Sequence, residues 1–176
     1  SVDAEVDLKE RLGSARNHSA THLLHAALKK VLGQHVSQRG SLVESHRLRF
    51  DFLHPQALSD TELKAVEDQV NAVILADIPV SKSYQSYKEA VAQGAIALFG
   101  EKYGEEVRVV RMGDESIELC GGMHVERTGQ IGLFKILSES GIASGIRRIE
   151  AITGITLVSW LRQQSDILAS LRELVK

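Results

Sequence analysis

The chain has 176 residues, of which 43% are hydrophobic and 25% are charged, so it is long enough to form one domain with a substantial core. Its 21 Lys and Arg residues nearly balance 23 Asp and Glu residues, giving a net charge of -2. This balance excludes a disordered chain and a globally basic nucleic-acid-binding protein, so any RNA contact is expected from a local patch. The apolar runs are far shorter than the ~20 residues of a membrane-spanning helix, and no membrane partner is expected.

The first predicted element in chain order is a helix over 14–32. Apolar residues recur along it at intervals of three and four, and Gly33 follows as a stop signal. At 100° per residue, His18, His22 and His25 lie close together on the side opposite this apolar stripe. The histidine side is therefore expected to face another part of the protein. The stripe consists of Ala20, Leu23, Leu24, Ala27, Leu28 and Val31.

The middle of the chain mixes short strands with helices. Ser59 and Glu62 form a capping box, which predicts that a helix begins there and runs to about Ala76. In the strand-like segment that precedes it, Leu48 and Phe50 alternate with polar residues, as in a half-buried strand. A second, short helix is predicted over 87–93. Strands are predicted over 36–43, 47–52, 107–112, 117–120, 133–138 and 146–152.

This order of elements, with hairpin-compatible spacing between 107 and 152, predicts an α+β domain with a largely antiparallel sheet packed with helices. After Gly154 the apolar residues follow the 3.5-residue period of a coiled-coil seam up to the last residues of the chain. Such a helix either packs on its own domain or continues toward a missing domain or a second chain. We therefore expect an N-terminal lead-in over 1–13, a domain over 14–154 and the start of a truncated heptad-patterned helix over 155–176. The seam positions are Leu157, Leu161, Gln164, Leu168, Leu171 and Val175.

Two pairs of residues have the spacing of metal ligands. His18 and His22 lie one helical turn apart on one face, which suits two ligands of one tetrahedral ion. Cys120 precedes His124 by four residues, across two glycines that let the backbone bend both side chains toward one point. Three imidazoles and one thiolate favour zinc, whereas the alternatives are a chance helix spacing and a small buried cysteine. The lone cysteine cannot form an internal disulfide, which is consistent with a reducing, cytoplasmic compartment.

Six separated motifs follow one another along the chain. They are Arg16–Leu28, Gln38–Val43, Leu48–Phe52, Ala97–Tyr103, Cys120–His124 and Gly145–Ala151. Together, and in this order, they resemble the editing domain of alanyl-tRNA synthetase, of the bacterial type. The resemblance covers about 15–154, and free-standing editing proteins called AlaX share the same core.

The resemblance implies the AlaX-like fold of the threonyl- and alanyl-tRNA synthetase editing domains. It also implies zinc-dependent hydrolysis of tRNA(Ala) wrongly charged with serine or glycine, with Ala-tRNA(Ala) spared. The partner would be the acceptor end of that tRNA, and ATP and Mg²⁺ would serve only the rest of a full-length synthetase. The residues that match the family's zinc ligands are His18, His22, Cys120 and His124.

Serine differs from alanine by one hydroxyl, so an editing pocket that hydrogen-bonds this hydroxyl rejects alanine by leaving a polar group unpaired. Gln38 matches the family's pocket glutamine, and Thr21 lies between the two helical histidines. The alternatives are a solvated strand side chain for Gln38 and a hydroxyl bonded to its own helix for Thr21. Met123 departs from the family, which usually has Thr there. Of the adjacent Arg147 and Arg148, which point to opposite faces, one is expected to contact tRNA.

Two alternative functions remain open from the sequence. The first is a free-standing trans-editing protein of the AlaX type. The second is a non-catalytic tRNA-binding module in which zinc is structural. A zinc ion that serves only structure should be lost together with the fold, whereas removal of a catalytic zinc should leave a folded but inactive chain.

Overall fold

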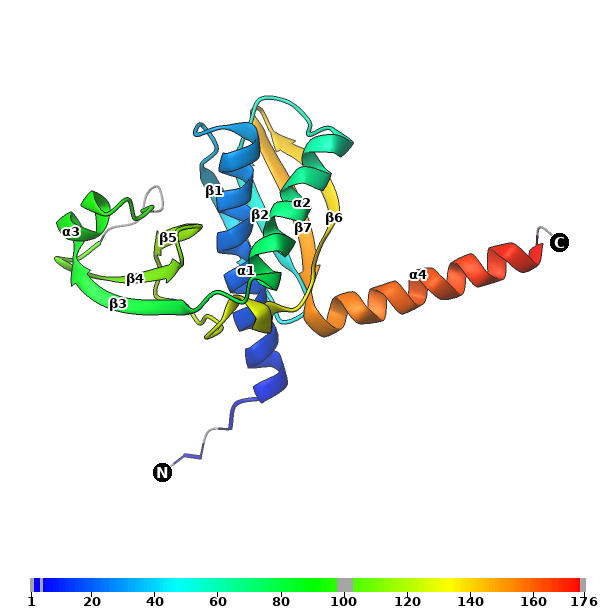
Figure 1. Ribbon diagram of the computed structural model, residues 1–176, viewed down its shortest axis with the longest axis horizontal. Coiled ribbons are helices and arrows are strands. Elements are labelled where there is room, and N and C mark those ends of the chain that lie inside the picture. Colours follow the sequence, from blue (N-terminus) through cyan, green and yellow to red (C-terminus); the bar gives the residue numbers. More distant parts are fainter. Residues whose placement is uncertain (1, 4, 98–102, 175–176) are drawn as a thin grey trace.

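The computed structural model describes residues 2–3, 5–97 and 103–174, and it shows an α+β chain with two antiparallel sheets (Figure 1). This confirms the predicted fold class. Most of the motif at 97–103 and the last predicted seam position, Val175, lie outside the described residues. The elements are α1 (Leu8–Leu32), β1 (Gln38–Val43), β2 (Leu48–Leu53), α2 (Asp60–Leu75), β3 (Val80–Ser86), α3 (Tyr87–Ala92), β4 (Glu106–Met112), β5 (Ser116–Leu119), the 3₁₀ helix η1 (Thr128–Ile131), β6 (Phe134–Ala143), β7 (Ile146–Thr153) and α4 (Gly154–Leu174).

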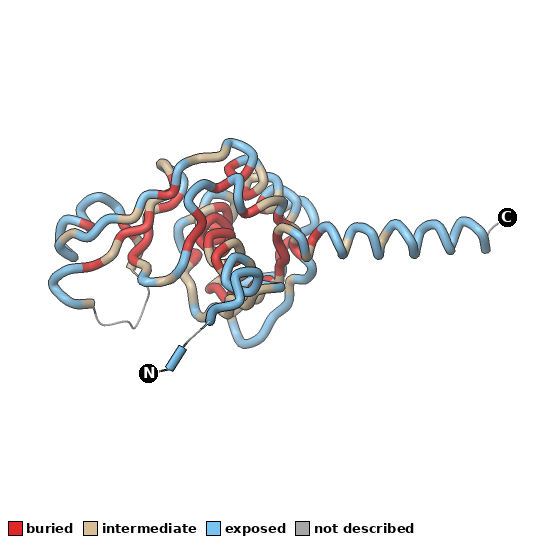
Figure 2. Tube along the Cα trace, turned by 90° about the horizontal axis from the view of Figure 1, so that it is seen from below, coloured by how far each residue is buried: buried red, intermediate tan, exposed pale blue. Residues whose placement is uncertain are grey.

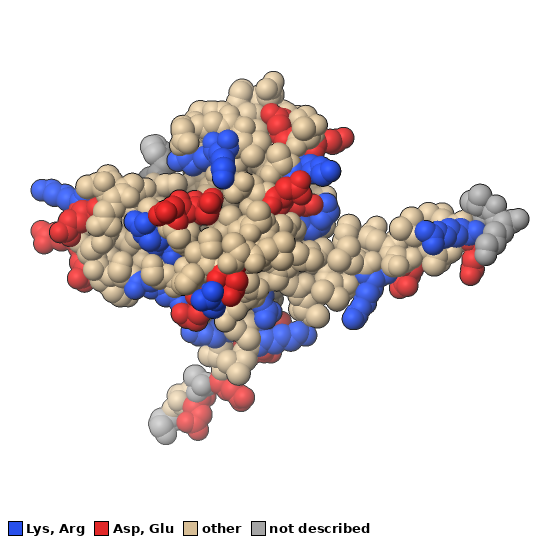
Figure 3. Space-filling view, in the orientation of Figure 1, with Lys and Arg blue, Asp and Glu red and all other residues tan. Residues whose placement is uncertain are grey.

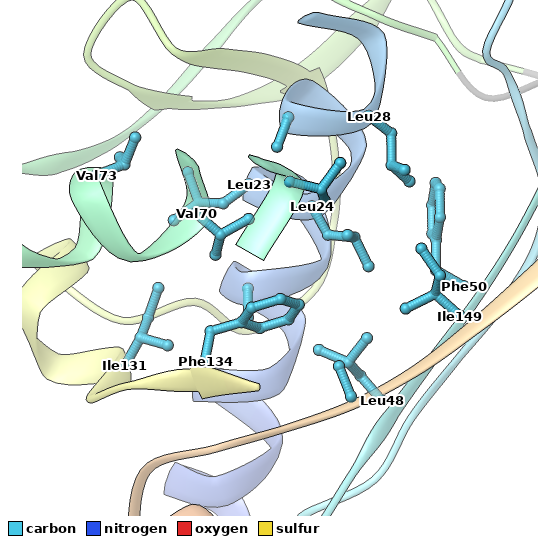
Figure 4. Packing of buried hydrophobic residues seen from close by; sticks show 14 of the residues in the cluster. Leu23, Leu24, Leu28, Leu48, Phe50, Val70, Val73, Ile131, Phe134 and Ile149 are labelled. Atoms are coloured by element: carbon cyan, nitrogen blue, oxygen red, sulfur yellow. The ribbon is translucent and has the colours of Figure 1, made fainter. Parts of the chain in front are cut away.

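The larger sheet has the strand order β1-β2-β7-β6, and α1 and α2 cover one of its faces (Figure 1). Every pair in this sheet is antiparallel, and Phe50 of β2 lies opposite Ile149 of β7. Leu24, Leu28 and Phe134 join them in the core, all at most 2% exposed (Figure 4). The predicted apolar stripe of α1 therefore faces α2 and this sheet.

The smaller sheet has the order β3-β4-β5 and lies on the other side of α1, with α3 beside it (Figure 1). It has its own small core, which includes Ala90, Val107, Val109 and Leu119. The first strand of this sheet, β3, was not predicted from the sequence. Its polar residues show no apolar alternation, and main-chain pairing with β4 makes it a strand.

Helix boundaries follow their caps. The α1 helix begins at Leu8, six residues before the predicted start, because Asp7 Oδ1 accepts hydrogen bonds from the backbone N–H groups of Lys9 and Glu10 at 2.8 and 3.2 Å. Part of the predicted lead-in thus belongs to α1. The capping box of Ser59 and Glu62 is present at the start of α2, as predicted.

The last helix, α4, projects away from the rest of the chain (Figures 1 and 2). Leu157 is buried beside the larger sheet, whereas Leu161, Leu168 and Leu171 are 46%, 57% and 51% exposed. The predicted seam is therefore open to solvent beyond the first turn of the helix. None of the described helices combines the length and the apolar character required to cross a bilayer.

Candidate metal centre

Two segments of the chain about 100 residues apart meet at one point between the sheets. The α1 helix supplies His18 and His22, and the loop after β5 supplies Cys120 and His124. One ligand atom from each of the four residues lies within 4.8 Å of the other three. Cys120 Sγ is 3.4 Å from His18 Nε2 and 3.3 Å from His124 Nε2. The structure thus brings together all four residues that the sequence nominated as ligands.

Ser19 fixes the orientation of His124. The Ser19 hydroxyl donates to the carbonyl of Ala15 at 2.9 Å and accepts from the backbone N–H of Val125 at 3.1 Å. Because this single proton is already used, the 3.1 Å contact between Ser19 Oγ and His124 Nδ1 requires the imidazole to donate. His124 Nε2 then carries the free lone pair that a metal ion needs.

Glu118 lies behind His22 and His25, in a buried polar row. Its Oε1 is 3.1 Å from His25 Nδ1, and its Oε2 is 3.7 Å from His22 Nε2. His22 is 4% exposed, and its Nδ1 has no hydrogen-bond partner among the described residues. A buried ring without a full hydrogen bond is costly, so His22 fits a site that a cation completes.

The loop that carries Cys120 is fixed by close packing and by one arginine. A Cβ atom on Gly122 would lie 2.1 Å from His18 Cε1, so only glycine lets the loop approach this ring. Arg108 of β4 donates to the carbonyls of Cys120 and Gly122 at 3.1 and 2.6 Å. One of the two glycines predicted to bend the loop, Gly122, therefore also makes room for a candidate ligand.

The electrostatics of the site keep its imidazoles neutral. Burial, together with His22, lowers the pKa of His18 to about 4 and the pKa of His124 to about 2. Burial also lowers the pKa of His22. Burial opposes the ionisation of Glu118, but His22 and His25 outweigh it and hold the pKa of Glu118 below its usual value. Neutral imidazoles beside a thiol are the state that binds a metal, and this donor set fits zinc.

The two predicted pocket residues lie near this centre without joining it. Thr21 is 4% exposed, and its hydroxyl donates to the carbonyl of Asn17 at 2.8 Å, which is the helix-internal bond of the alternative interpretation. Gln38 lies at the start of β1 and lines a small cavity of about 80 Å³ with His25 and Ala97. Its amide contacts Ser41 Oγ at 3.4 Å. Both residues remain candidates for contact with a substrate.

The two neighbouring arginines are both engaged within the protein. Arg147 pairs with Glu139 at 2.5 Å, and Arg148 pairs with Asp51 at 2.7 Å on the opposite face of the sheet. Their predicted opposite directions are thus seen, but each guanidinium already has a carboxylate partner. The expected contact of one of them with tRNA stays a prediction.

Sequence reasoning missed three residues that organise the centre: Ser19, Arg108 and Glu118. Each acts through hydrogen bonds to residues distant in the chain. The sequence of β5 gives no sign of the role of Glu118, because a buried carboxylate in a strand is recognisable only when its histidine partners are placed beside it. The position of Ser19 next to His18 was the only local signal.

Comparison with known families assigns the class of domain. Residues 107–150 match the family described as "Threonyl and Alanyl tRNA synthetase second additional domain". This segment contains all but the first residue of β4, the strand β5 and the loop that carries Cys120 and His124. The matched segment is thus similar to a domain described for these two synthetases.

Similarity to individual proteins extends over nearly the whole chain. An alanine-tRNA ligase of Pseudothermotoga lettingae is 60% identical over 96% of this chain and 20% of the relative. Those of Nitratidesulfovibrio vulgaris and Clostridioides difficile are each 56% identical, over 99% and 96% of this chain and 20% and 19% of the relatives. The chain spans about a fifth of the length of these relatives. The resemblance to the editing region of alanyl-tRNA synthetase is confirmed.

Proposed function

We propose that the chain hydrolyses the ester of tRNA(Ala) mischarged with serine or glycine and spares Ala-tRNA(Ala). The observation that carries this proposal is the convergence of His18, His22, Cys120 and His124 on one point. It is supported by the similarity of the chain to alanine-tRNA ligases. We take these four side chains to be the ligands of a zinc ion.

Bound zinc would supply a positive charge that polarises the ester carbonyl or lowers the pKa of a water molecule. The residues of this chain would prepare that chemistry. Ser19 presents Nε2 of His124, and Arg108 fixes the loop of Cys120. Glu118, which contacts His25 through its other oxygen, lies behind the ring of His22. These groups keep the ligands in place before a substrate arrives, which is what a preorganised site requires.

Selection of serine over alanine would rest on Thr21 and Gln38. Since Thr21 Oγ1 donates to its own helix, it retains lone pairs that accept a hydrogen bond from a serine hydroxyl. Gln38 has a carbonyl oxygen and a weakly bound amide for the same purpose. Alanine would leave such a polar group unpaired in a buried site, and this is the basis on which it is spared.

The ligase activity of the relatives, with its ATP and Mg²⁺, would belong to the parts of an alanyl-tRNA synthetase that this chain does not match. Within that protein, in the cytoplasm, the chain would serve as the proofreading segment. The acceptor end of tRNA(Ala) would be its partner. The helix α4 would lead to the neighbouring domain or to a second chain.

The test is deacylation of Ser-tRNA(Ala), Gly-tRNA(Ala) and Ala-tRNA(Ala) by the zinc-loaded chain. We expect the seryl and glycyl esters to be hydrolysed and the alanyl ester to be spared. A chelator should abolish the activity and added zinc should restore it. Cys120→Ala should be folded and inactive, whereas Ser170→Ala on the exposed helix α4 should behave as wild type. Hydrolysis that survives complete removal of zinc would overturn the proposed role of the metal.

A structural zinc is the second candidate, favoured by one observation. Four protein donors converge on one point, which is the number of protein ligands in structural zinc sites, whereas catalytic sites usually keep one position open. In that case the chain would bind tRNA without hydrolysing it. Circular dichroism during chelation separates the two functions, since loss of a structural zinc should unfold the chain.

A further inference from the structure

A groove of about 460 Å³ opens beside the candidate metal centre. One wall is formed by the first turns of α1, with Arg11 and Leu12, and the other by β3 and β4. The loop over 121–124 completes the lining, and it includes His124. The groove therefore connects solvent with one of the proposed zinc ligands.

The charge of this groove is locally positive although the chain is not. Its lining contains Arg11, Lys82 and Arg108 against one carboxylate, Glu126. Lys82 pairs with Glu126 at 2.5 Å and Arg108 donates to two loop carbonyls, so these three cations still exceed the single carboxylate by two charges. The Arg11 guanidinium has no ion pair or hydrogen bond with any residue in the described part of the chain. Elsewhere, the face shown in Figure 3 intersperses both signs of charge. A polyanion would thus find its cations concentrated at the groove.

An exposed aromatic side chain stands among these cations. Tyr84 is 69% exposed, lies two residues from Lys82 on the same face of β3, and is directly opposite Arg108 in β4. Leu12 and Met123 add apolar surface to the lining, at 51% and 39% exposed. Proteins that bind single-stranded nucleic acids combine two elements. Cationic side chains contact the phosphates, and aromatic rings stack on the bases.

A second hollow on the other side of the same loop offers a comparison. It measures about 430 Å³ and shares Arg108, Gly121 and Gly122 with the groove. Among the residues that the structure describes, its charged lining consists of that arginine and of Glu106, so these two charges balance. Charge therefore distinguishes two hollows of similar size, and a polyanion is expected in the first.

We infer that the groove beside α1 binds the single-stranded 3′ end of an RNA, with a base stacked on Tyr84 and phosphates at Arg11 and Lys82. The identity of that RNA as the acceptor end of tRNA(Ala) rests on the proposed function. A strand in this groove has its terminal ester beside His124, at the candidate metal centre. The groove thus accounts for how a chain with a net charge of -2 holds RNA locally.

The experiment measures the affinity of the zinc-loaded chain for two RNA minihelices that carry no amino acid. One has the single-stranded 3′ end of an acceptor stem, and the other is the same minihelix without that end. Tyr84→Ala should weaken binding of the first by about 5- to 150-fold, the range for one stacked base. Arg11→Gln should reduce the slope of log K against log salt by about 0.7, the value for one phosphate of a single strand. Neither variant should change the zinc content or the binding of the blunt minihelix.

Two controls carry matched changes outside the groove. Arg162→Gln removes an arginine from the exposed helix α4, and Tyr87→Ala removes a tyrosine that stacks on Tyr103 near the second hollow. Both should bind the minihelix as wild type does. The inference is wrong if the controls lose as much affinity as the groove variants, or if only Tyr87→Ala loses affinity. It is also wrong if wild type binds both minihelices equally or binds neither.

Deacylation separates this inference from the proposed function. If the ester is hydrolysed, the groove variants should raise KM and leave kcat unchanged. If wild type binds through its 3′ end but hydrolyses nothing, the hydrolase proposal fails and the groove stands. If wild type hydrolyses Ser-tRNA(Ala) and the groove variants keep its KM, the groove assignment is wrong and the hydrolase proposal stands.

Discussion

The two sides of α1 are equally buried and chemically opposite. On one side, Leu24 and Leu28 are fully buried against α2 and the larger sheet. On the other, His22 and His25 are 4% and 2% exposed beside Glu118 of the smaller sheet. One helix thus belongs to a hydrophobic core and to a polar centre at the same time.

This difference separates stability from chemistry within one element. Apolar burial stabilises the fold in proportion to the area removed from water. Buried imidazoles cost free energy unless a partner satisfies them, so they are tolerated where they hold something. Substitutions on the leucine side should therefore change unfolding alone, and substitutions around the histidine side should change metal binding.

The largest expected effect comes from the leucine side. Leu24→Ala leaves a cavity in the core and should lower the free energy of unfolding by about 2–5 kcal/mol, which is about 30- to 4,000-fold in the unfolding equilibrium. Urea unfolding of the zinc-free chain measures this, with Leu168→Ala on α4 as an exposed control expected within about 0.5 kcal/mol of wild type. If the folded Leu24→Ala chain binds zinc more weakly than wild type, the two sides of α1 are coupled.

On the histidine side, Gly122→Ala should weaken zinc binding by about 100-fold, at the upper end of effects seen for residues that position ligands. The new Cβ would collide with the ring of His18 and displace it. Competition with a chromogenic chelator gives the affinity. Gly121→Ala is the matched control, since its added Cβ would meet no heavy atom of the described chain within 4 Å. Equal affinities of the two variants would contradict the packing argument.

Glu118→Gln should weaken zinc binding by about tenfold, at the lower end of the same range, because the amide keeps the shape of Glu118 but loses its charge. The reason is the loss of a carboxylate behind His22 and His25. The chelator assay applies again, with Glu126→Gln as a control on the exposed side of the loop. An unchanged affinity would show that Glu118 only fills space between the sheets.

A further expected effect is a pH dependence of the metal-free chain. His18 and His124 have pKa values of about 4 and about 2 in the folded chain, below the ordinary value of 6.5. Between each lowered pKa and 6.5, the unfolded chain binds more protons than the folded chain does. The free energy of unfolding should therefore fall as the pH falls from about 6.5 toward 4. The urea midpoints of unfolding of wild type and His18→Gln, measured between pH 7.5 and 4.5, test this. The midpoint of the variant should fall less steeply with falling pH than that of wild type. Parallel declines would show that His18 titrates normally.

Local patterns predicted most elements because they depend on neighbours in the chain. The stripe of α1 and the capping box of Ser59 and Glu62 are such patterns, and the structure has both. The pattern failed for β3, which is polar and becomes a strand only through pairing with β4. It also missed the first two turns of α1, where an exposed cap rather than an apolar stripe starts the helix.

The sequence by itself determined the α+β class, the side-chain types of the candidate ligands and the spacing within each histidine or cysteine pair. These follow from helix period and side-chain chemistry, which act over a few residues. Tertiary structure alone decided that the two pairs meet, that Ser19 and Glu118 orient His124 and His22, and that Gly122 makes room for His18. Such contacts join residues about 100 positions apart, and only packing of the smaller sheet against α1 brings them within bonding distance.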